Sequence, residues 1–153
     1  MLASDEKITP TVNVSNVQIQ EPIKTYRIQI YDSPIFTVTK DNVNVHIILD
    51  TGATASLITI NKAKELRLNV MPTSHKAVQV DGVSNLKVLG EVHTQFYRGK
   101  LTFQFSGLVV ENLGTDVLGG TNFHSDNDIY CRMAQGTIVV KGNNVFQMRR
   151  LQK

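Results

Sequence analysis

Hydrophobic and polar residues alternate along most of the chain with a period of two, which is typical of half-buried β-strands. In residues 25–31, for example, Tyr26, Ile28 and Ile30 alternate with polar side chains. The same alternation recurs at 35–40, 43–49, 86–92, 101–105, 138–140 and 145–148. Turn sequences separate these runs, among them Asp41-Asn42, Arg98-Gly99-Lys100 and Gly142-Asn143-Asn144. The pattern predicts an all-β domain of mostly antiparallel strands.

Helical periodicity is scarce. The best candidate is about 60–68, where Ile60, Ala63 and Leu66 recur every three residues and charged side chains lie between them. Thr59 is a suitable N-cap for this helix. A second short helix is predicted to begin near Thr121.

The two ends of the chain differ from this core. Residues 1–24 are rich in Thr, Asn, Gln and Val, and we predict a leader segment that is partly flexible or forms an edge strand. Residues 25–142 are predicted to form one domain. Residues 143–153 are predicted to add a C-terminal strand and a basic tail.

The composition fits one globular domain, with 41% hydrophobic and 19% charged residues among 153. The net charge of +3 is mild and scattered, which argues against binding of nucleic acid. Cys131 is the only cysteine, so no internal disulfide can form and a reducing compartment is expected. The four histidines lack metal-ligand spacing, and we predict no metal and no cofactor. No apolar stretch reaches membrane-span length, and the polar start is no signal peptide, so we expect a soluble, intracellular domain.

The segment with the most chemical information is 43–58, where a hydrophobic strand ends at Asp50. Thr51 and Gly52 follow, and a glycine here permits a tight turn in which backbone approaches the carboxylate closely. Asp-Thr-Gly alone is a weak signal, because it also serves as an ordinary strand exit. An aspartate at the end of a buried strand, however, places a carboxylate where solvent access is restricted. Asp50 is therefore the first candidate for a catalytic group.

Asp50 has no partner carboxylate in a second motif, because Asp-Thr-Gly occurs once and Asp-Ser-Gly does not occur. One half-site in a short chain suggests that the other half comes from a twofold-related copy. Two carboxylates brought together in this way cannot both ionise cheaply and would share a proton. One could then activate a water while the other protonates the scissile carbonyl. This chemistry is peptide hydrolysis without a metal or a covalent intermediate.

Residues 43–58 resemble the catalytic segment of the retropepsins, the aspartic proteases of retroviruses, pararetroviruses and LTR retrotransposons. Residues 77–92 resemble the flap of that family, a hairpin that closes over substrate. Residues 116–123 resemble its apolar-apolar-glycine segment, which packs beneath the active-site loop. The features occur in the family's order, and the resemblance covers about 25–142. It implies a closed-barrel-like acid-protease fold with one or two short helices, assembled as a symmetric homodimer.

The resemblance also implies roles for individual residues. Asp50 would be the catalytic carboxylate, Thr51 would brace the two loops across the dimer interface, and Gly52 would permit close approach. The implied substrate-binding residues lie in the loop, the flap tip and the apolar segment: Ala53, Thr54, Val80, Asp81, Gly82, Val83, Ser84, Val117 and Leu118. Gly82 is also explained by a plain hairpin turn, because Asp-Gly is a strong turn signal.

The chain departs from many retroviral members at one ion pair. Those members carry an aspartate where Thr54 stands and an arginine after the later glycine, where this chain has Thr121. The Gly119-Gly120 doublet also leaves the local register open by one residue. How the dimer is buttressed therefore differs from that pattern, whereas the catalytic chemistry does not.

The resemblance predicts an aspartic endopeptidase that processes a retroelement polyprotein and binds its substrate as an extended strand. The cytoplasm or a virus-like particle would be its location, with no membrane partner. A domesticated cellular retropepsin-like protease is one alternative. A non-catalytic dimerisation module that keeps the fold is another, although the intact Asp50-Thr51-Gly52 favours an enzyme.

Overall fold

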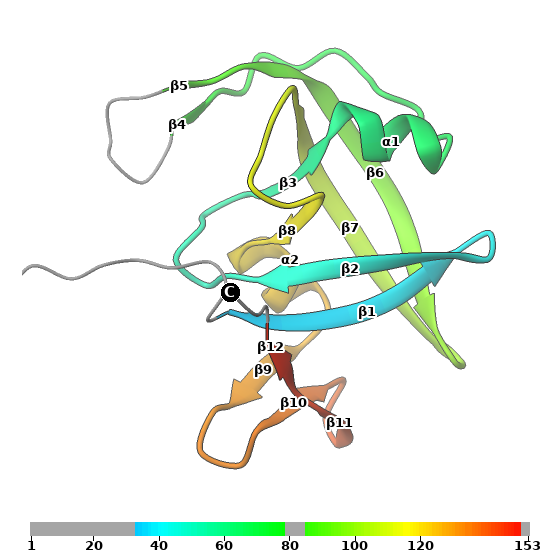
Figure 1. Ribbon diagram of the computed structural model, residues 1–153, viewed down its shortest axis with the longest axis vertical. Coiled ribbons are helices and arrows are strands. Elements are labelled where there is room, and N and C mark those ends of the chain that lie inside the picture. Colours follow the sequence, from blue (N-terminus) through cyan, green and yellow to red (C-terminus); the bar gives the residue numbers. More distant parts are fainter. Residues whose placement is uncertain (1–32, 79–84, 151–153) are drawn as a thin grey trace, which may run out of the picture.

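The computed structural model describes residues 33–78 and 85–150. The predicted leader, the predicted strand at 25–31 and the tip of the predicted flap lie outside the described residues. Within them the chain is mainly β-structure with two short helices (Figure 1), as the alternation of hydrophobic positions predicted.

The described residues form twelve strands and two helices. The strands are β1 (Pro34–Lys40), β2 (Val43–Leu49), β3 (Ser56–Thr59), β4 (Ala77–Val78), β5 (Asn85–Leu86), β6 (Val88–Arg98), β7 (Leu101–Val110), β8 (Val117–Gly119), β9 (Ile129–Arg132), β10 (Thr137–Val140), β11 (Asn144–Gln147) and β12 (Arg149–Arg150). The helices are α1 (Ile60–Glu65) and α2 (Thr121–Asp126).

Strands of the largest sheet close into a barrel. This sheet has the order β12-β1-β2-β8-β3-β7-β6. Thr39 of β1 also pairs with Tyr97 of β6, which joins the two sides of the sheet and closes a barrel of six strands, with β12 outside it. The β4–β5 pair lies above this barrel in Figure 1, and the β11-β10-β9 sheet lies below it. The predicted all-β, closed-barrel fold is confirmed.

The predicted hairpin turns have backbone conformations that suit them. Asp41 and Asn42 have φ angles of 49° and 68°, as expected for a two-residue turn between the paired strands β1 and β2. Gly142, with a φ of 93°, lies in the turn between β10 and β11. Glycine adopts this left-handed conformation without a steric penalty, which explains its use here.

Helix α1 begins where the sequence predicted but ends earlier. The Thr59 side chain accepts a hydrogen bond of 3.2 Å from the backbone of Lys62, so Thr59 is the N-cap. The prediction of a helix to residue 68 was too long, because the helix ends at Glu65. Arg67 has a φ of 57°, and a residue in this left-handed region cannot continue a right-handed helix.

Phenylalanine side chains fill the centre of the barrel. The fully buried ones are Phe36, Phe96, Phe103, Phe105 and Phe123. Phe36 and Phe103 contact edge to face, with ring centroids 5.0 Å apart. Burying each such side chain contributes roughly 1.5–3 kcal/mol of hydrophobic free energy.

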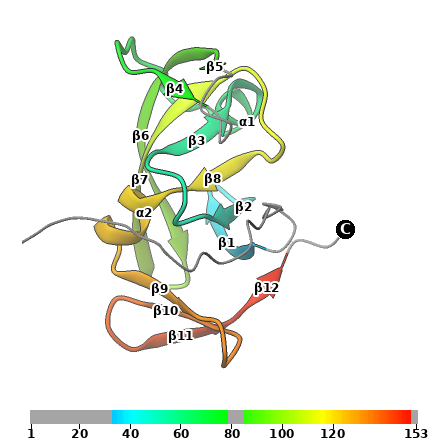
Figure 2. The same ribbon diagram turned by 90° about the vertical axis from the view of Figure 1, so that its left-hand side faces the viewer.

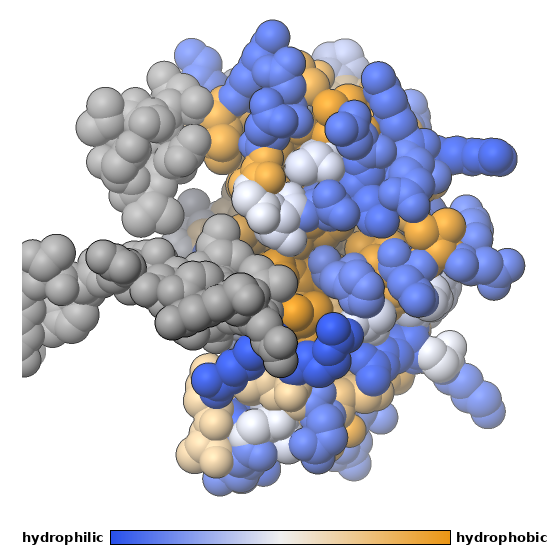
Figure 3. Space-filling view, in the orientation of Figure 1, coloured by the Kyte–Doolittle hydropathy of each residue, from blue (hydrophilic) through white to orange (hydrophobic). Residues whose placement is uncertain are grey.

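Hydrophilic side chains cover most of the face seen in Figure 3, with hydrophobic ones in patches between them.

One strand departs from simple alternation at its end. Ile48 lies on the polar side of β2 by sequence pattern, yet only 2% of it is exposed. The reason is that β2 is an interior strand of the sheet, with β1 on one side and β8 on the other. Ile48 is paired in parallel with Leu118 of β8, and parallel strands are usually covered on both faces. This burial fixes the end of β2, where Asp50 follows.

Cation–π contacts and strand pairing attach the β11-β10-β9 sheet to the barrel. The Arg98 guanidinium of β6 lies 4.3 Å from the ring centroid of Phe146 in β11 and 5.3 Å from that of Phe36 in β1. Pro34 and Ile35 of β1 pair with the short strand β12. Figure 2 shows this sheet below the barrel from a second direction. No helix among the described residues has the length and apolarity to span a membrane.

Candidate active site

Asp50 lies at the carboxyl end of β2, in the loop that leads to β3. Strand β8 lies between β2 and β3 and pairs with both, parallel to β2 and antiparallel to β3. The loop therefore crosses over the end of β8, on the left of the barrel in Figure 1. Strand β4 lies above the loop on the same side of the barrel in both ribbon views.

Backbone hydrogen bonds fix the aspartate from two directions. The Asp50 N–H donates to the Gly119 carbonyl at 2.9 Å, which extends the β2–β8 ladder by one residue. The Gly52 N–H donates to the Asp50 Oδ1 at 2.9 Å, and the Ala53 N–H donates to the Asp50 carbonyl at 3.2 Å. Asp50 is half-buried, whereas Thr51 and Gly52 are exposed. A carboxylate is thus held at the surface in one orientation.

Gly52 is close to the carboxylate because it has no side chain. A Cβ at this position would lie 3.1 Å from the Asp50 Oδ1. That separation is tighter than most real Cβ contacts, so the carboxylate would have to shift. The glycine therefore permits the N–H to approach the carboxylate.

The segment after β8 supports the loop from beneath. The Thr121 N–H donates to the Ala53 carbonyl at 2.9 Å, and the Gly120 N–H donates to the Ser56 Oγ at 3.0 Å. The Ser56 hydroxyl in turn donates to the Asn122 Oδ1 at 2.7 Å. Leu49 pairs with Gly119, so Gly120 is the residue that passes under the loop. This pairing resolves the register that the glycine doublet left open.

Comparisons with known proteins identify the family of this chain. The sequence model of the family described as "Aspartyl protease" matches residues 36–128, which is more than half of the chain. The chain belongs to this aspartyl protease family. No curated protein matches its sequence.

Solved structures show which fold within the aspartyl proteases it shares. The retroviral protease-like domain of Ddi1 from Leishmania major superimposes with a TM-score of 0.63 at 17% identity, covering 79% of this chain and 97% of that one. The EIAV protease, solved with the inhibitor HBY-793, superimposes with a TM-score of 0.52 at 16% identity, covering 66% of this chain and 93% of that one. At these identities the likeness concerns the fold, which is that of the retropepsins.

The predicted substrate-binding residues of this aspartyl protease lie in three places. Ala53 and Thr54 lie in the loop after Asp50, and Ala53 packs against the hydrophobic cluster that contains Leu118. Val117 is fully buried in the main core. The flap-tip residues Val80, Asp81, Gly82, Val83 and Ser84 lie outside the described residues.

Sequence reasoning missed the residues that replace the absent ion pair. Thr54 and Thr121 carry no charge, and the loop is tied to the segment below it through Ser56 and Asn122 instead. Ser56 is fully buried, and Asn122 also donates to the Ser106 carbonyl at 2.8 Å. In the sequence, the only sign of this contact is a single serine at the start of an apolar strand. A hydroxyl buried in such a strand needs a hydrogen-bond partner.

The described residues offer little to metal or thiol chemistry. No group of three or more His, Cys, Asp or Glu side chains in residues 33–78 and 85–150 could hold a metal ion. Burial raises the pKa of the Cys131 thiol, so less of the reactive thiolate forms.

Proposed function

We propose that this chain is an aspartic endopeptidase that acts as a homodimer, with one Asp50 from each chain. The observation that carries the proposal is the Asp50 loop. It holds one oriented carboxylate at the surface, and the full sequence contains no second copy of its motif. A chain that supplies one of two catalytic carboxylates obtains the other most simply from a second copy of the same chain.

In such a dimer the two Asp50 carboxylates share one proton, because two adjacent negative charges repel. The ionised carboxylate takes a proton from a water, whose oxygen attacks the scissile carbonyl carbon. The protonated carboxyl gives its proton to the carbonyl oxygen. The resulting diol collapses as one of its hydroxyls gives a proton to the ionised carboxylate. The carbon–nitrogen bond breaks, and the departing amine takes a proton from the other carboxyl, which restores the singly protonated dyad. No step needs a covalent link to the enzyme.

The exposed loop residues have roles in this proposal. Thr51 hydrogen-bonds across the twofold axis and braces the two loops. Ala53 and Thr54 contact the substrate backbone, together with the predicted flap residues 80–84. The substrate lies as an extended strand between the loop and the flap hairpin, whose strand β4 lies on the same side of the barrel.

Two biological substrates are compatible with this chemistry. The first is a retroelement polyprotein from which the domain is itself cut. The second is a cellular protein, if the chain is a domesticated protease. The second is supported by the Ddi1 domain, whose structure covers more of this chain than the EIAV protease does.

The test compares wild type with Asp50→Asn on a peptide library. The asparagine side chain has almost the same shape but cannot share the proton, so cleavage should be lost while the fold is kept. Adding an excess of Asp50→Asn chains should inhibit wild type through mixed dimers, and specific activity should fall on dilution. Full activity of the variant would refute the assignment of Asp50. Constant specific activity where sedimentation shows monomers would refute the shared site, and folded dimers that cleave no peptide would favour a non-catalytic module.

A further inference from the structure

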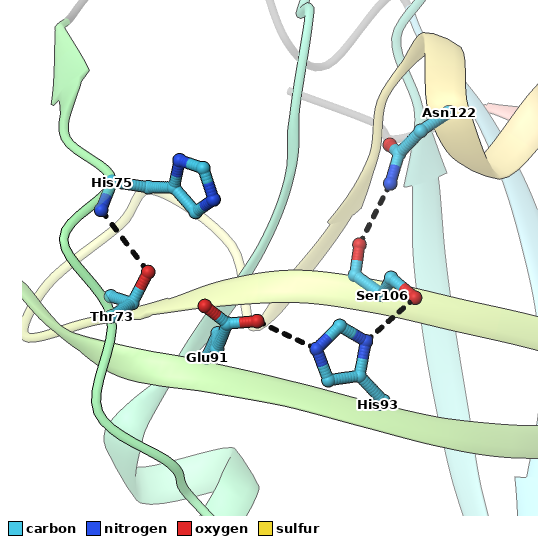
Figure 4. Close-up of polar contacts among 6 residues, drawn as sticks. All are labelled: Thr73, His75, Glu91, His93, Ser106 and Asn122. Carbon is cyan, nitrogen blue, oxygen red and sulfur yellow. Dashed lines mark hydrogen bonds and ion pairs between the residues drawn. The ribbon is translucent and has the colours of Figure 1, made fainter.

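A pocket of about 320 Å³ with a mixed polar and apolar lining lies beside the Asp50 loop and the segment that precedes β4. Its polar lining comes from segments far apart in the sequence and includes Thr54, His75, Lys76, Glu91, His93 and Ser106, which together define the Lys76 pocket. In Figure 4, His75 lies on one side of this space and Asn122 on the other, with Glu91 and His93 between them. None of these residues except Thr54 belongs to the predicted site.

Several polar groups of the pocket already bind one another. The His93 Nε2 lies 2.6 Å from the Glu91 Oε1, so the imidazole donates to the carboxylate. The His93 Nδ1 lies 2.9 Å from the Ser106 Oγ. Hydrogen bonding from the Thr73 side chain, and then from His93, lowers the pKa of Glu91, so the ionised form of this carboxyl is favoured.

The remaining polar groups of the pocket are mainly donors. Within residues 33–78 and 85–150, no hydrogen bond or ion pair engages the Lys76 ammonium, the His75 ring or the Thr54 hydroxyl. Lys76 and His75 are also exposed. A ligand that enters the pocket thus meets the Lys76 cation and two further groups able to donate. A carboxylate matches this set, because it accepts hydrogen bonds and carries the opposite charge.

The position of the pocket indicates where that carboxylate comes from. Thr54 is four residues after Asp50, so their Cα atoms are at most about 15 Å apart along the chain. An extended peptide advances about 3.3 Å per residue. A substrate residue within about five positions of the cleaved bond therefore reaches the pocket.

We propose that the Lys76 pocket binds an acidic side chain of the peptide substrate, with Lys76 and His75 as the residues that select it. This specificity rests on the proposed endopeptidase function, because it assigns the ligand to the substrate. Glu91 and His93 form the opposite wall, where the Glu91 Oε1 accepts a hydrogen bond from His93.

Binding is measured with the full-length Asp50→Asn protein, so that cleavage does not interfere. The probes are fluorescein-labelled octapeptides that are random except at one fixed position, which carries Glu, Gln or Lys. We expect one position to favour Glu over Gln by about two- to fivefold in Kd, the range of a solvent-exposed ion pair. Lys76→Ala should remove the preference, His75→Ala should weaken it, and Lys76→Glu should transfer it to Lys peptides. Lys100→Glu, which makes the same charge change in the β6–β7 turn, should leave it intact.

The dependence on salt concentration tests whether the Glu preference is electrostatic. Raising the ionic strength from about 0.1 M to about 1 M shortens the Debye length from about 10 Å to about 3 Å and should abolish the Glu preference. The proposal is overturned if no position favours Glu, if Lys is favoured instead, or if Lys76→Ala keeps the preference. A wild-type enzyme that cleaves peptides without any Glu preference would refute the pocket alone. A Glu preference in a protein that cleaves nothing would refute the endopeptidase alone.

Discussion

Gly120→Ala tests whether the segment beneath the Asp50 loop sets the geometry of the site. The φ of Gly120 is −87°, which any residue adopts, so the cost of a side chain is purely steric. A Cβ would lie 2.4 Å from the Ala55 carbonyl oxygen and 2.7 Å from that of Ala53. To leave even 3.0 Å, the Ala55 carbonyl must retreat by about 0.6 Å. Both contacts are backbone, so the loop itself must move.

Two consequences follow from that movement. Overpacking a filled site costs about 1–3 kcal/mol, and the rigid backbone on both sides places Gly120→Ala near 2–3 kcal/mol. The melting temperature should then fall by about 4–12 °C. A shift of this size at Asp50 should lower kcat by about tenfold to a hundredfold, because catalytic groups must be held within about 0.5 Å.

Two other glycines provide matched controls for thermal unfolding and peptide cleavage. A Cβ at Gly136 meets nothing within 4 Å, so its left-handed φ of 67° alone should cost about 1–2 kcal/mol, with normal kcat. A Cβ at Gly119 would meet side-chain atoms, the nearest being the Phe123 Cδ2 at 2.9 Å, and should have an intermediate effect. Gly120→Ala with wild-type stability and kcat would refute the idea that this segment positions the loop.

Two further substitutions test single polar groups. The pKa of Glu91 is lower in the folded protein than its ordinary value of 4.5. The ionised carboxylate therefore stabilises the fold at pH values above 4.5. This stabilisation is lost as the pH falls through the pKa of the folded state. Glu91→Gln should therefore lower the melting temperature at neutral pH, and the difference should shrink as the pH falls below 4.5. A pH-independent difference would contradict this reasoning. His124 has a buried Nε2 without a partner among the described residues, while its Nδ1 lies 2.7 Å from the Gly120 carbonyl. His124→Leu removes the unpaired nitrogen, while the Gly120 carbonyl still accepts the hydrogen bond from the backbone N–H of residue 124. The free energy of unfolding measured by urea denaturation should therefore rise by about 1 kcal/mol. A decrease of that size would contradict the reasoning.

The sequence was sufficient to predict features that depend on neighbouring residues. Alternation located the strands, Asp41-Asn42 and Gly142 located turns, and Thr59 located the start of α1. Asp50 was placed at the end of β2 because the apolar run stops there. The length of α1 was not predictable in this way, because Arg67 adopts a left-handed conformation that its residue type does not require.

Features that depend on residues far apart in the chain could not be predicted. Ser56 and Asn122 are separated by 66 positions, and only the threading of β8 between β2 and β3 brings them together. His93 and Ser106 are direct partners in the β6–β7 ladder, whose register follows from the short turn at Gly99-Lys100, but no local pattern indicates that these two side chains bind each other. Both contacts are polar, and hydrophobic periodicity carries no information about which polar side chains will pair.

These long-range contacts join the active-site loop to the Lys76 pocket. The Ser56 hydroxyl binds the Gly120 N–H beneath the loop and the Asn122 side chain, which binds the Ser106 carbonyl. The Ser106 hydroxyl then contacts His93 on the pocket wall. Because these residues share one network, replacing Ser56 or Asn122 would disturb the Asp50 loop and the pocket together. The side chains of Lys76 and His75 have no hydrogen bond or ion pair to this network among the described residues, and for that reason they can separate substrate selection from catalysis.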